Sequence, residues 1–475
     1  MNNLSILTKH VLTVLVIWTG SASLSVADIR LPHLLSSHMV LQRERPVTLW
    51  GWADPGEVVR VTPSWNGKTD RVTASADGRW ELQVPTPAAG GPYTIQFRGH
   101  NTIELTDVLI GEVWICSGQS NMAMNGTSGL ADIRSEKAHA THPNIRFFKM
   151  PRASVPLPAD DCTANWQRCD STSLNTFSAV GYFFGKRLAD TLAIPIGLIE
   201  AAWGGTSAEV WTPADVLSAD AKLSEIAEQI PASDHWPTQP GFAYNGMIAP
   251  LTSFEIAGVI WYQGENNVGP YSGNYHHLFT TLIQAWRAEW QRPLPFYYVQ
   301  IAPYHYPVPL SAAVLREAQT KVLSLPNTAM VLTTDLVSDT SDVHPTNKRD
   351  VGMRLANTAL AKHYKLRKIP YRHPTFHRMR IRKNRIVVTF KHANGLTLTQ
   401  PGARDFRIAG ADGIFRPAEV RVEGNKVVFW NANIPNPVAV RYGFDDTATA
   451  SLFNHAGMPA APFRTDRWPI AGQRQ

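Results

Sequence analysis

The middle of the chain, about residues 108 to 365, alternates between short apolar runs and amphipathic segments. The apolar runs, which we expect to be strands, lie at 113–116, 196–200, 257–263, 296–301 and 329–334. Between them, apolar residues recur at helical spacing, as in Val180, Phe183, Phe184 and Leu188, or in Leu278, Leu282, Ile283, Trp286 and Trp290. This alternation predicts an α/β core: a parallel sheet covered by helices on both faces. Active sites in such sheets collect at the carboxyl ends of the strands.

Two flanking regions show strand patterns instead. Residues 28–107 contain short alternating runs, such as 47–52 and 80–84, between Gly-rich, Asn-rich and Pro-rich turns. That spacing predicts an N-terminal β-sandwich. Similar runs return from 366 to 475, after the α/β region at 108–365. The sequence leaves open whether this C-terminal β region is a separate domain or completes the N-terminal one.

The first 27 residues have the pattern of an export signal. Lys9 and His10 precede the apolar run 11–18, and small residues lie just before and at Ala27. The run is too short to span a bilayer. We therefore expect cleavage near Ala27, a periplasmic or secreted mature protein, and no membrane insertion.

Composition narrows the class of protein. The chain has 475 residues, 44% of them hydrophobic and 15 of them Trp, so we expect a well-packed globular protein with several domains. The formal net charge is +7, but no nucleic-acid-binding motif accompanies it, and no nucleic-acid partner is expected. Oligomeric state stays open.

The three cysteines do not have the spacing of a metal site. In an oxidising compartment Cys162 and Cys169 could pair, a point that the sequence leaves open. Cys116 is then left over, and we interpret it as a small buried apolar residue.

Candidate chemistry begins in the loop after the first core strand. There Ser120 lies between Gly118 and an expected helix start, which would expose its hydroxyl at the top of the sheet. Backbone N–H groups at such a turn face a developing oxyanion. Ser117 is the competing nucleophile, although it lies closer to the strand.

Two further strand-end loops offer hydrogen-bond donors and a carboxylate. Residues 203–206 read Trp-Gly-Gly-Thr, and paired glycines let the backbone approach a ligand closely. In the third loop, Gln263 can supply an amide donor and Glu265 a carboxylate, although capping or surface solvation would also explain Glu265.

The loop after the last core strand carries the candidate base. His344 lies there near Asp339 and Asp342. A nearby carboxylate fixes the imidazole tautomer and stabilises the imidazolium that forms when the ring takes a serine proton. A serine from the first loop and a histidine from the last therefore indicate acyl-transfer chemistry.

Taken together, these segments resemble the sialate O-acetylesterase family of the SGNH hydrolase superfamily. The most specific matches are Gly-Gln-Ser-Asn-Met at 118–122 and Trp-Tyr-Gln-Gly-Glu at 261–265, in this order. Shorter matches lie at 38–42, 177–184, 203–205, 244–250, 342–345 and 462–466. The similarity thus runs along most of the expected mature chain.

The resemblance implies a three-layer SGNH-hydrolase-like core with β accessory regions at both ends, and neither metal nor organic cofactor. It assigns Ser120 as nucleophile and His344 as base, with an oxyanion hole made by the backbone N–H groups of Ser120 and Gly205 and by the Gln263 side chain. The substrate-binding residues expected beside them are Asn121, Glu265 and Trp203.

The chain departs from the superfamily pattern at the third triad member. The position three residues before the histidine is Ser341, and the nearest acid is Asp342. Asp342 is therefore the first candidate and Asp339 the second, with a Ser-His dyad as a further option.

The expected activity is removal of acetyl groups from O-acetylated sugars of the sialic acid type. Acetylated hemicellulose, xylan or xyloglucan, is the alternative substrate. The alternative from another class of protein is a non-catalytic carbohydrate-binding protein with a degenerate hydrolase core.

Overall fold

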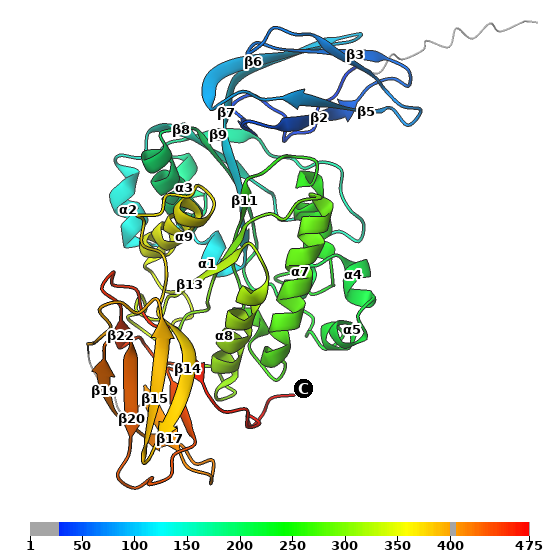
Figure 1. Ribbon diagram of the computed structural model, residues 1–475. Helices are drawn as coiled ribbons and strands as arrows, with labels where there is room; N and C mark the ends of the chain where they lie inside the picture. Colours follow the sequence, from blue (N-terminus) through cyan, green and yellow to red (C-terminus); the bar gives the residue numbers. More distant parts are fainter. Residues whose placement is uncertain (1–27, 400–404, 475) are drawn as a thin grey trace, which may run out of the picture.

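The computed structural model describes residues 28–399 and 405–474 (Figure 1). The expected signal segment, 1–27, lies outside the described residues. Within them, no helix is both long enough and apolar enough to cross a bilayer.

The centre of the molecule is a largely parallel sheet. Its strand order is β13-β12-β11-β7-β10-β8-β9, and only the last pairing, β8 with β9, is antiparallel. The strands are β7 (Thr102–Gly118), β8 (His142–Lys149), β9 (Trp166–Cys169), β10 (Ile196–Ala202), β11 (Gly258–Tyr262), β12 (Phe296–Val299) and β13 (Thr328–Val331). The sequence pattern predicts β7 and β10 to β13 but not β8 and β9, because polar residues interrupt the apolar signal in both and β8 also holds Pro143.

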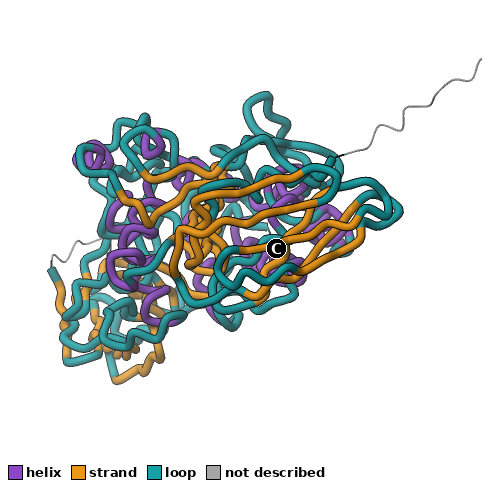
Figure 2. The backbone as a smooth tube through the Cα atoms, turned by 90° about the horizontal axis from the view of Figure 1, so that it is seen from above, coloured by secondary structure: helices purple, strands orange, loops and turns teal. Residues whose placement is uncertain are grey.

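Helices cover both faces of this sheet, as Figures 1 and 2 show. On one face, α3 (Ala179–Leu192) packs against α9 (Lys348–Lys362). The two helices and the sheet share an apolar core that includes Trp114, Phe184 and Leu355. On the other face lie α7 (Tyr275–Glu289) and α8 (Ser311–Lys321), around Trp261 and Trp286. The three-layer α/β core is therefore confirmed.

Short helical elements connect these layers. The α-helical ones are α1 (Ser120–Ala123), α2 (Ala131–Lys137), α4 (Ala214–Ser218), α5 (Ala221–Ala227) and α6 (Phe242–Met247). The 3-10 turns are η1 (Ser173–Asn175), η2 (Ala208–Trp211), η3 (Ala249–Leu251), η4 (Glu265–Asn267), η5 (Ser272–Asn274) and η6 (Val322–Ser324).

The N-terminal β region is built on the first half of β7. Strand β6 pairs with it antiparallel, β3 pairs with β6 and β4 with β3, while β1 runs parallel to β7 and β2 pairs with β5 as a separate two-stranded sheet. Their bounds are β1 (Val40–Gln42), β2 (Pro46–Trp52), β3 (Val58–Pro63), β4 (Asp70–Thr73), β5 (Arg79–Pro85) and β6 (Gly90–Arg98). The expected boundary at 107/108 falls inside β7, because this one strand serves both regions.

The C-terminal β region has its own apolar core, with Ile386, Phe429 and Tyr442 at its centre. Two four-stranded sheets and a short pair form it: β14-β15-β20-β19, β18-β17-β21-β23 and β16-β22. The strands are β14 (Thr375–Arg382), β15 (Arg385–Lys391), β16 (Thr397–Leu398), β17 (Phe406–Ala409), β18 (Arg416–Pro417), β19 (Glu419–Glu423), β20 (Lys426–Trp430), β21 (Ala439–Tyr442), β22 (Leu452–Phe453) and β23 (Phe463–Arg464).

The two β regions lie at opposite ends of the core and do not complete one another (Figure 1). The C-terminal region is fastened to the start of α8, where Asp446 Oδ1 accepts the backbone N–H groups of Ala312 at 2.8 Å and Ala313 at 3.0 Å. An ion pair of 3.0 Å joins Arg464 to Glu317. The question that the sequence left open is thereby answered in favour of separate regions.

All three cysteines are free thiols in the structure. The pairing of Cys162 with Cys169 that the sequence left open is not present. Cys116 is fully buried, and that burial raises the pKa of its thiol well above the ordinary value. It packs as a small apolar residue, in agreement with its interpretation from the sequence.

Candidate active site

Ser120 is positioned by a sharp turn at the carboxyl end of β7. Gly118 makes this turn with φ of +135°, and a Cβ there would lie 2.1 Å from the carbonyl oxygen of Tyr262 on the neighbouring strand. A residue with a side chain therefore does not fit, and the chain can swing from the sheet into α1 directly after Gln119. Ser120, the first residue of α1, is brought to the rim of the sheet.

His344 reaches the same point from the loop between β13 and α9. Its Nε2 lies 2.9 Å from Ser120 Oγ, although the two residues are 224 positions apart in sequence. Burial and the nearby positive charge of Lys348 lower the pKa of the imidazole. The ring is therefore mostly neutral at pH 7, the form that accepts a proton from a hydroxyl.

Of the two candidate acids, only Asp342 is near the histidine. Its Oδ1 accepts the backbone N–H of His344 at 2.8 Å and lies 3.5 Å from Nδ1 of the ring. The Asp342 side chain is 54% exposed, so the ion pair is screened by water. Asp339 instead accepts the backbone N–H of Ser341 at 2.8 Å and its hydroxyl at 2.7 Å, and so shapes the loop.

The second loop lies against the serine. A Cβ at Gly204 would be 3.3 Å from that of Ser120, while one at Gly205, where φ is +80°, would lie 2.4 Å from the ring of Trp236. Glycine at 205 thus lets this indole ring close over the loop. Within the described residues, neither the Ser120 nor the Gly205 backbone N–H donates a hydrogen bond, so both are available to an oxyanion.

The position of Gln263 differs from the expected one. Its side chain is fully buried; the amide nitrogen donates to Asn267 Oδ1 at 2.7 Å and to the Thr206 carbonyl at 3.2 Å, and its oxygen accepts the Tyr275 hydroxyl at 2.8 Å. Both N–H donors are therefore occupied by protein acceptors. Gln263 ties the second and third loops together instead of presenting a free amide to the site.

Asn121 and Glu265, which we expected to bind substrate, belong to a buried cluster. Asn121 Nδ2 donates to Glu265 Oε1 at 2.5 Å, and Asn121 Oδ1 accepts from Lys348 Nζ at 2.5 Å. Asn121 has no exposed surface and Glu265 is 7% exposed. This arrangement corrects the expectation for Asn121, because a fully buried amide with both ends bonded does not reach a substrate.

Electrostatics within this cluster follow from burial. Removal from water lowers the pKa of Lys348 to about 7 and raises the pKa of the Glu265 carboxyl. Asn121 also donates to the Val343 carbonyl at 3.0 Å, next to His344. The cluster, made of Asn121, Glu265 and Lys348, therefore fixes the histidine loop relative to the serine loop.

Sequence reasoning missed Lys348 and Trp236. A signal for Lys348 does exist: it opens α9, and a cation is disfavoured at a helix N-terminus unless a partner holds it there. Trp236 lies in an irregular segment between α5 and α6, with no periodicity to mark it. Only the fold brings its ring to Gly205.

Trp203, the remaining expected substrate-binding residue, is partly exposed in the second loop. The guanidinium of Arg152 lies over its ring, 5.9 Å from the centroid, and is exposed to solvent. A cavity of about 630 Å³ borders the ends of the second and third loops and is lined among others by Asn266, Trp236 and Tyr271. Apolar rings and polar groups therefore lie beside these loops, a combination that suits sugars.

The fold and the paired serine and histidine define a hydrolase of the three-layer α/β type. Comparison with known proteins narrows this class. A family model, "Carbohydrate esterase, sialic acid-specific acetylesterase", matches residues 110–361. The chain therefore belongs to this family of carbohydrate esterases, as the sequence resemblance indicated.

Individual relatives agree. The human sialate O-acetylesterase is 30% identical over 387 residues, which cover 73% of each chain. The mouse sialate O-acetylesterase is 26% identical over 510 residues, 91% of this chain and 94% of its own. The crystal structure of a carbohydrate acetylesterase from Xanthomonas citri superposes with a TM-score of 0.84 at 36% identity, covering 93% of this chain and all of that one. The protein is an O-acetylesterase whose substrate is an acetylated carbohydrate.

Proposed function

We propose that Ser120 and His344 carry out acetyl transfer through a covalent acetyl-enzyme. Ser120 Oγ bonds to the acetyl carbonyl carbon while His344 Nε2 takes its proton. The tetrahedral intermediate collapses, the bond from carbon to the sugar oxygen breaks, and His344 gives the proton to that oxygen. Water then repeats the cycle, with His344 as base, and acetate leaves. The observation that carries this proposal is the 2.9 Å separation of Ser120 Oγ and His344 Nε2.

The oxyanion is held, in this proposal, by two backbone N–H groups, those of Ser120 and Gly205. Pre-oriented donors of this kind stabilise the charge that develops on the carbonyl oxygen. Gln263 acts as a positioning residue, since its amide would have to leave Asn267 before it could donate to substrate. Asp342 orients the imidazole only weakly, because it is exposed and lies 3.5 Å from Nδ1.

The sugar is proposed to be of the sialic acid type. Two observations support this class: the curated relatives are named sialate O-acetylesterases, and an exposed cation, Arg152, lies beside Trp203. A guanidinium there can pair with the carboxylate of an acidic sugar while the indole packs against its ring. Acetylated hemicellulose is the alternative, and it has no carboxylate for Arg152 to bind.

Acetate release from both substrate classes tests the proposal. Ser120→Ala is expected to reduce release by on the order of 10⁴-fold or more, because the residual rate comes only from binding and the oxyanion donors. Arg152→Gln is expected to raise KM for O-acetyl sialic acid and to leave acetylated xylan oligosaccharides and 4-nitrophenyl acetate unaffected.

Ser117→Ala serves as the matched control, since the Ser117 hydroxyl is buried and donates to the Ala201 carbonyl at 2.6 Å. Normal turnover by Ser120→Ala would refute the nucleophile. Turnover only on hemicellulose would refute the sialic acid assignment and leave the mechanism intact.

A further inference from the structure

A cleft separates the two-stranded β2–β5 sheet from the catalytic core. Its volume is about 910 Å³, within the usual range for ligand sites. One wall is the β2–β5 sheet, and the other is formed by the first residues of α4, by α6 and by the end of α7. Among the described residues that line it, none belongs to the loops that carry Ser120 and His344. The cleft is therefore distinct from the site described above.

Aromatic and polar side chains alternate on the wall that the β2–β5 sheet forms. On β2, Thr48, Trp50 and Trp52 share the partly exposed face, because every second residue of the strand is buried. Across the antiparallel register, Trp50 is opposite Glu81 and Trp52 opposite Arg79. Each indole thus has a charged neighbour, so the wall offers flat apolar rings flanked by hydrogen-bonding groups.

Both rings are held in place. The Arg30 guanidinium lies 3.7 Å from the centroid of the Trp52 ring and covers one face of it. Trp50 meets Phe254 of the core edge-on, with centroids 6.4 Å apart. Rings that are fixed before binding lose little conformational entropy on contact with a ligand.

The facing wall and the rim are acidic. The cleft is lined by four carboxylates: Asp160, Asp215, Glu289 and, on β5, Glu81. Among the described lining residues, Arg79 is the one cation. Arg79 is already paired with Asp160 at 2.5 Å. Carboxylates accept hydrogen bonds from hydroxyl groups and repel other carboxylates. The chemistry favours a neutral polyhydroxylated ligand over an acidic one.

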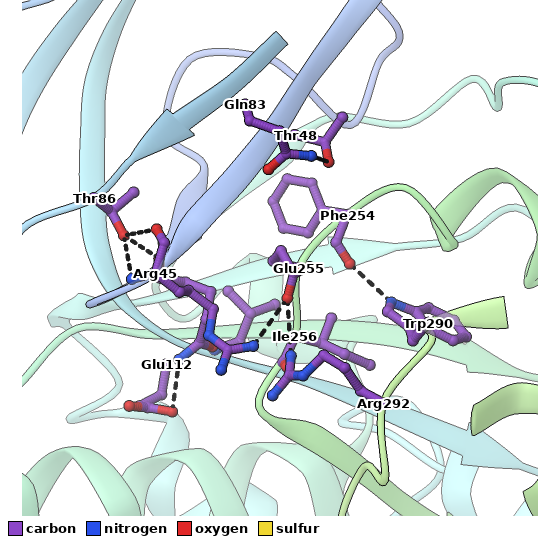
Figure 3. Close-up of polar contacts among 12 residues, drawn as sticks. Arg45, Thr48, Gln83, Thr86, Glu112, Phe254, Glu255, Ile256, Trp290 and Arg292 are labelled. Atoms are coloured by element: carbon purple, nitrogen blue, oxygen red, sulfur yellow. Dashed lines mark hydrogen bonds and ion pairs between the residues drawn. The ribbon is translucent and has the colours of Figure 1, made fainter. Parts of the chain in front are cut away.

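Polar contacts tie the N-terminal β region to the core next to Phe254, the ring that Trp50 meets. Figure 3 shows Glu255 of the core between Arg45 of the N-terminal region and Arg292; its Oε2 lies 3.1 Å from the first and 2.8 Å from the second. Below the Thr48–Gln83 pair, Phe254 accepts the indole N–H of Trp290 through its carbonyl at 2.9 Å. These contacts hold the N-terminal β region against the core.

We propose that this cleft is a second carbohydrate-binding site, which takes a neutral saccharide chain by packing it on Trp50 and Trp52 and by hydrogen bonds to the carboxylates. Binding there does not depend on ester cleavage. A neutral chain occurs both in hemicellulose and in the inner sugars of sialylated glycans, so the site is compatible with either substrate. Its role is to hold the polymer while acetyl groups elsewhere on it reach Ser120.

Calorimetric titration of the full chain carrying Ser120→Ala tests this proposal, with xylohexaose and with a sialyl-oligosaccharide of similar length as probes. Xylohexaose is expected to bind, and Trp50→Ala in the same background is expected to weaken it by about tenfold. Trp430→Ala, a partly exposed indole in the C-terminal β region, is the matched control and should not change it.

Glu81→Ala guards against a folding artefact, because Glu81 is exposed to solvent on β5 and its substitution leaves the core intact. It should also weaken xylohexaose binding. In the wild-type background, Trp50→Ala should hydrolyse 4-nitrophenyl acetate normally. Three outcomes would overturn the proposal, whatever the result for ester hydrolysis. They are that xylohexaose fails to bind, that its affinity is unchanged by both Trp50→Ala and Glu81→Ala, or that the sialyl-oligosaccharide binds this site more tightly than xylohexaose does.

Discussion

Ser120 and Asn121 are neighbours in the chain but belong to two different regions of the site. On the Ser120 side, the hydroxyl lies within hydrogen-bonding distance of the His344 imidazole, which is partly exposed to solvent. On the Asn121 side, the amide joins Glu265 and Lys348 in a cluster shut off from water. The same loops supply both sides: His344 and Lys348 come from one segment, and Ser120 and Asn121 from another.

The difference shows how reacting groups are held when they themselves make few contacts. The side chains of Ser120 and His344 make few strong contacts apart from the one between them. The buried cluster of Asn121, Glu265 and Lys348 therefore holds the two loops at the distance that the pair requires. Substitutions on the open side should therefore affect the rate and leave the free energy of unfolding almost unchanged. Substitutions in the cluster should reduce that free energy.

The largest expected effect is on the open side. His344→Ala should reduce kcat for both a sugar acetate and 4-nitrophenyl acetate by on the order of 10⁴-fold, because no other base within the described residues is hydrogen-bonded to Ser120 Oγ. The thermal midpoint should hardly move. His277→Ala, which removes an exposed histidine paired with Asp220, is the control. Retained turnover in His344→Ala would mean that another group accepts the proton.

The next effect is on the buried side. Lys348→Met should lower the free energy of unfolding by about 3 kcal/mol, because it leaves the buried Asn121 and Glu265 without their cation. Urea unfolding measures this loss. Adding Glu265→Gln should restore much of it by removing the opposite charge. An unfolding midpoint equal to that of the wild type would show that the cluster does not brace the site.

A smaller effect separates the two acids of the histidine loop. Asp342→Asn should reduce kcat by at most about fivefold, the value of an exposed ion pair, and far less than for a buried triad aspartate. Asp339→Asn should leave kcat unchanged, since in the described part of the chain the Asp339 carboxylate accepts hydrogen bonds only from Ser341. A loss of several thousandfold in Asp342→Asn would instead indicate that the carboxylate closes on Nδ1 during the reaction.

The smallest effect is a shift along the pH axis. Activity needs neutral His344, and burial together with Lys348 lowers the pKa of this imidazole, so the acidic limb of kcat/KM should lie below pH 6.5. Protonation of the imidazole causes the loss as pH falls. Lys348→Met removes the repelling charge and should move the limb to higher pH. A limb that stays in place would show that burial alone sets the pKa.

The apolar pattern predicted the core well because parallel strands buried on both faces are continuous apolar runs. That signal covers β10 to β13 and the core half of β7. Strand β8 was missed since it begins with His142 and Pro143 and carries the buried Arg146 among its apolar residues. The shared strand β7 was divided at 107/108 because a single strand that serves two sheets has no turn signal to show it.

For the site, sequence placed Ser120 and His344 in loops that meet, since strand ends on one edge of a sheet are neighbours. It could not show which way each side chain points. Asn121 and Gln263 were expected to face the substrate, yet both turn inward, and their hydrogen bonds to Lys348 and Asn267 depend on tertiary contacts that local patterns do not encode.

Because β7 runs unbroken from the N-terminal β region to Gly118, that region is not a detachable module. Cutting the chain at residue 107 would remove Thr102–Thr106 from the strand that carries the nucleophile and expose the edge that β6 covers. Exchange of accessory modules between relatives would have to preserve this strand whole. The β2–β5 sheet, which lines the proposed saccharide cleft, does not pair with β7 and could change without breaking this strand.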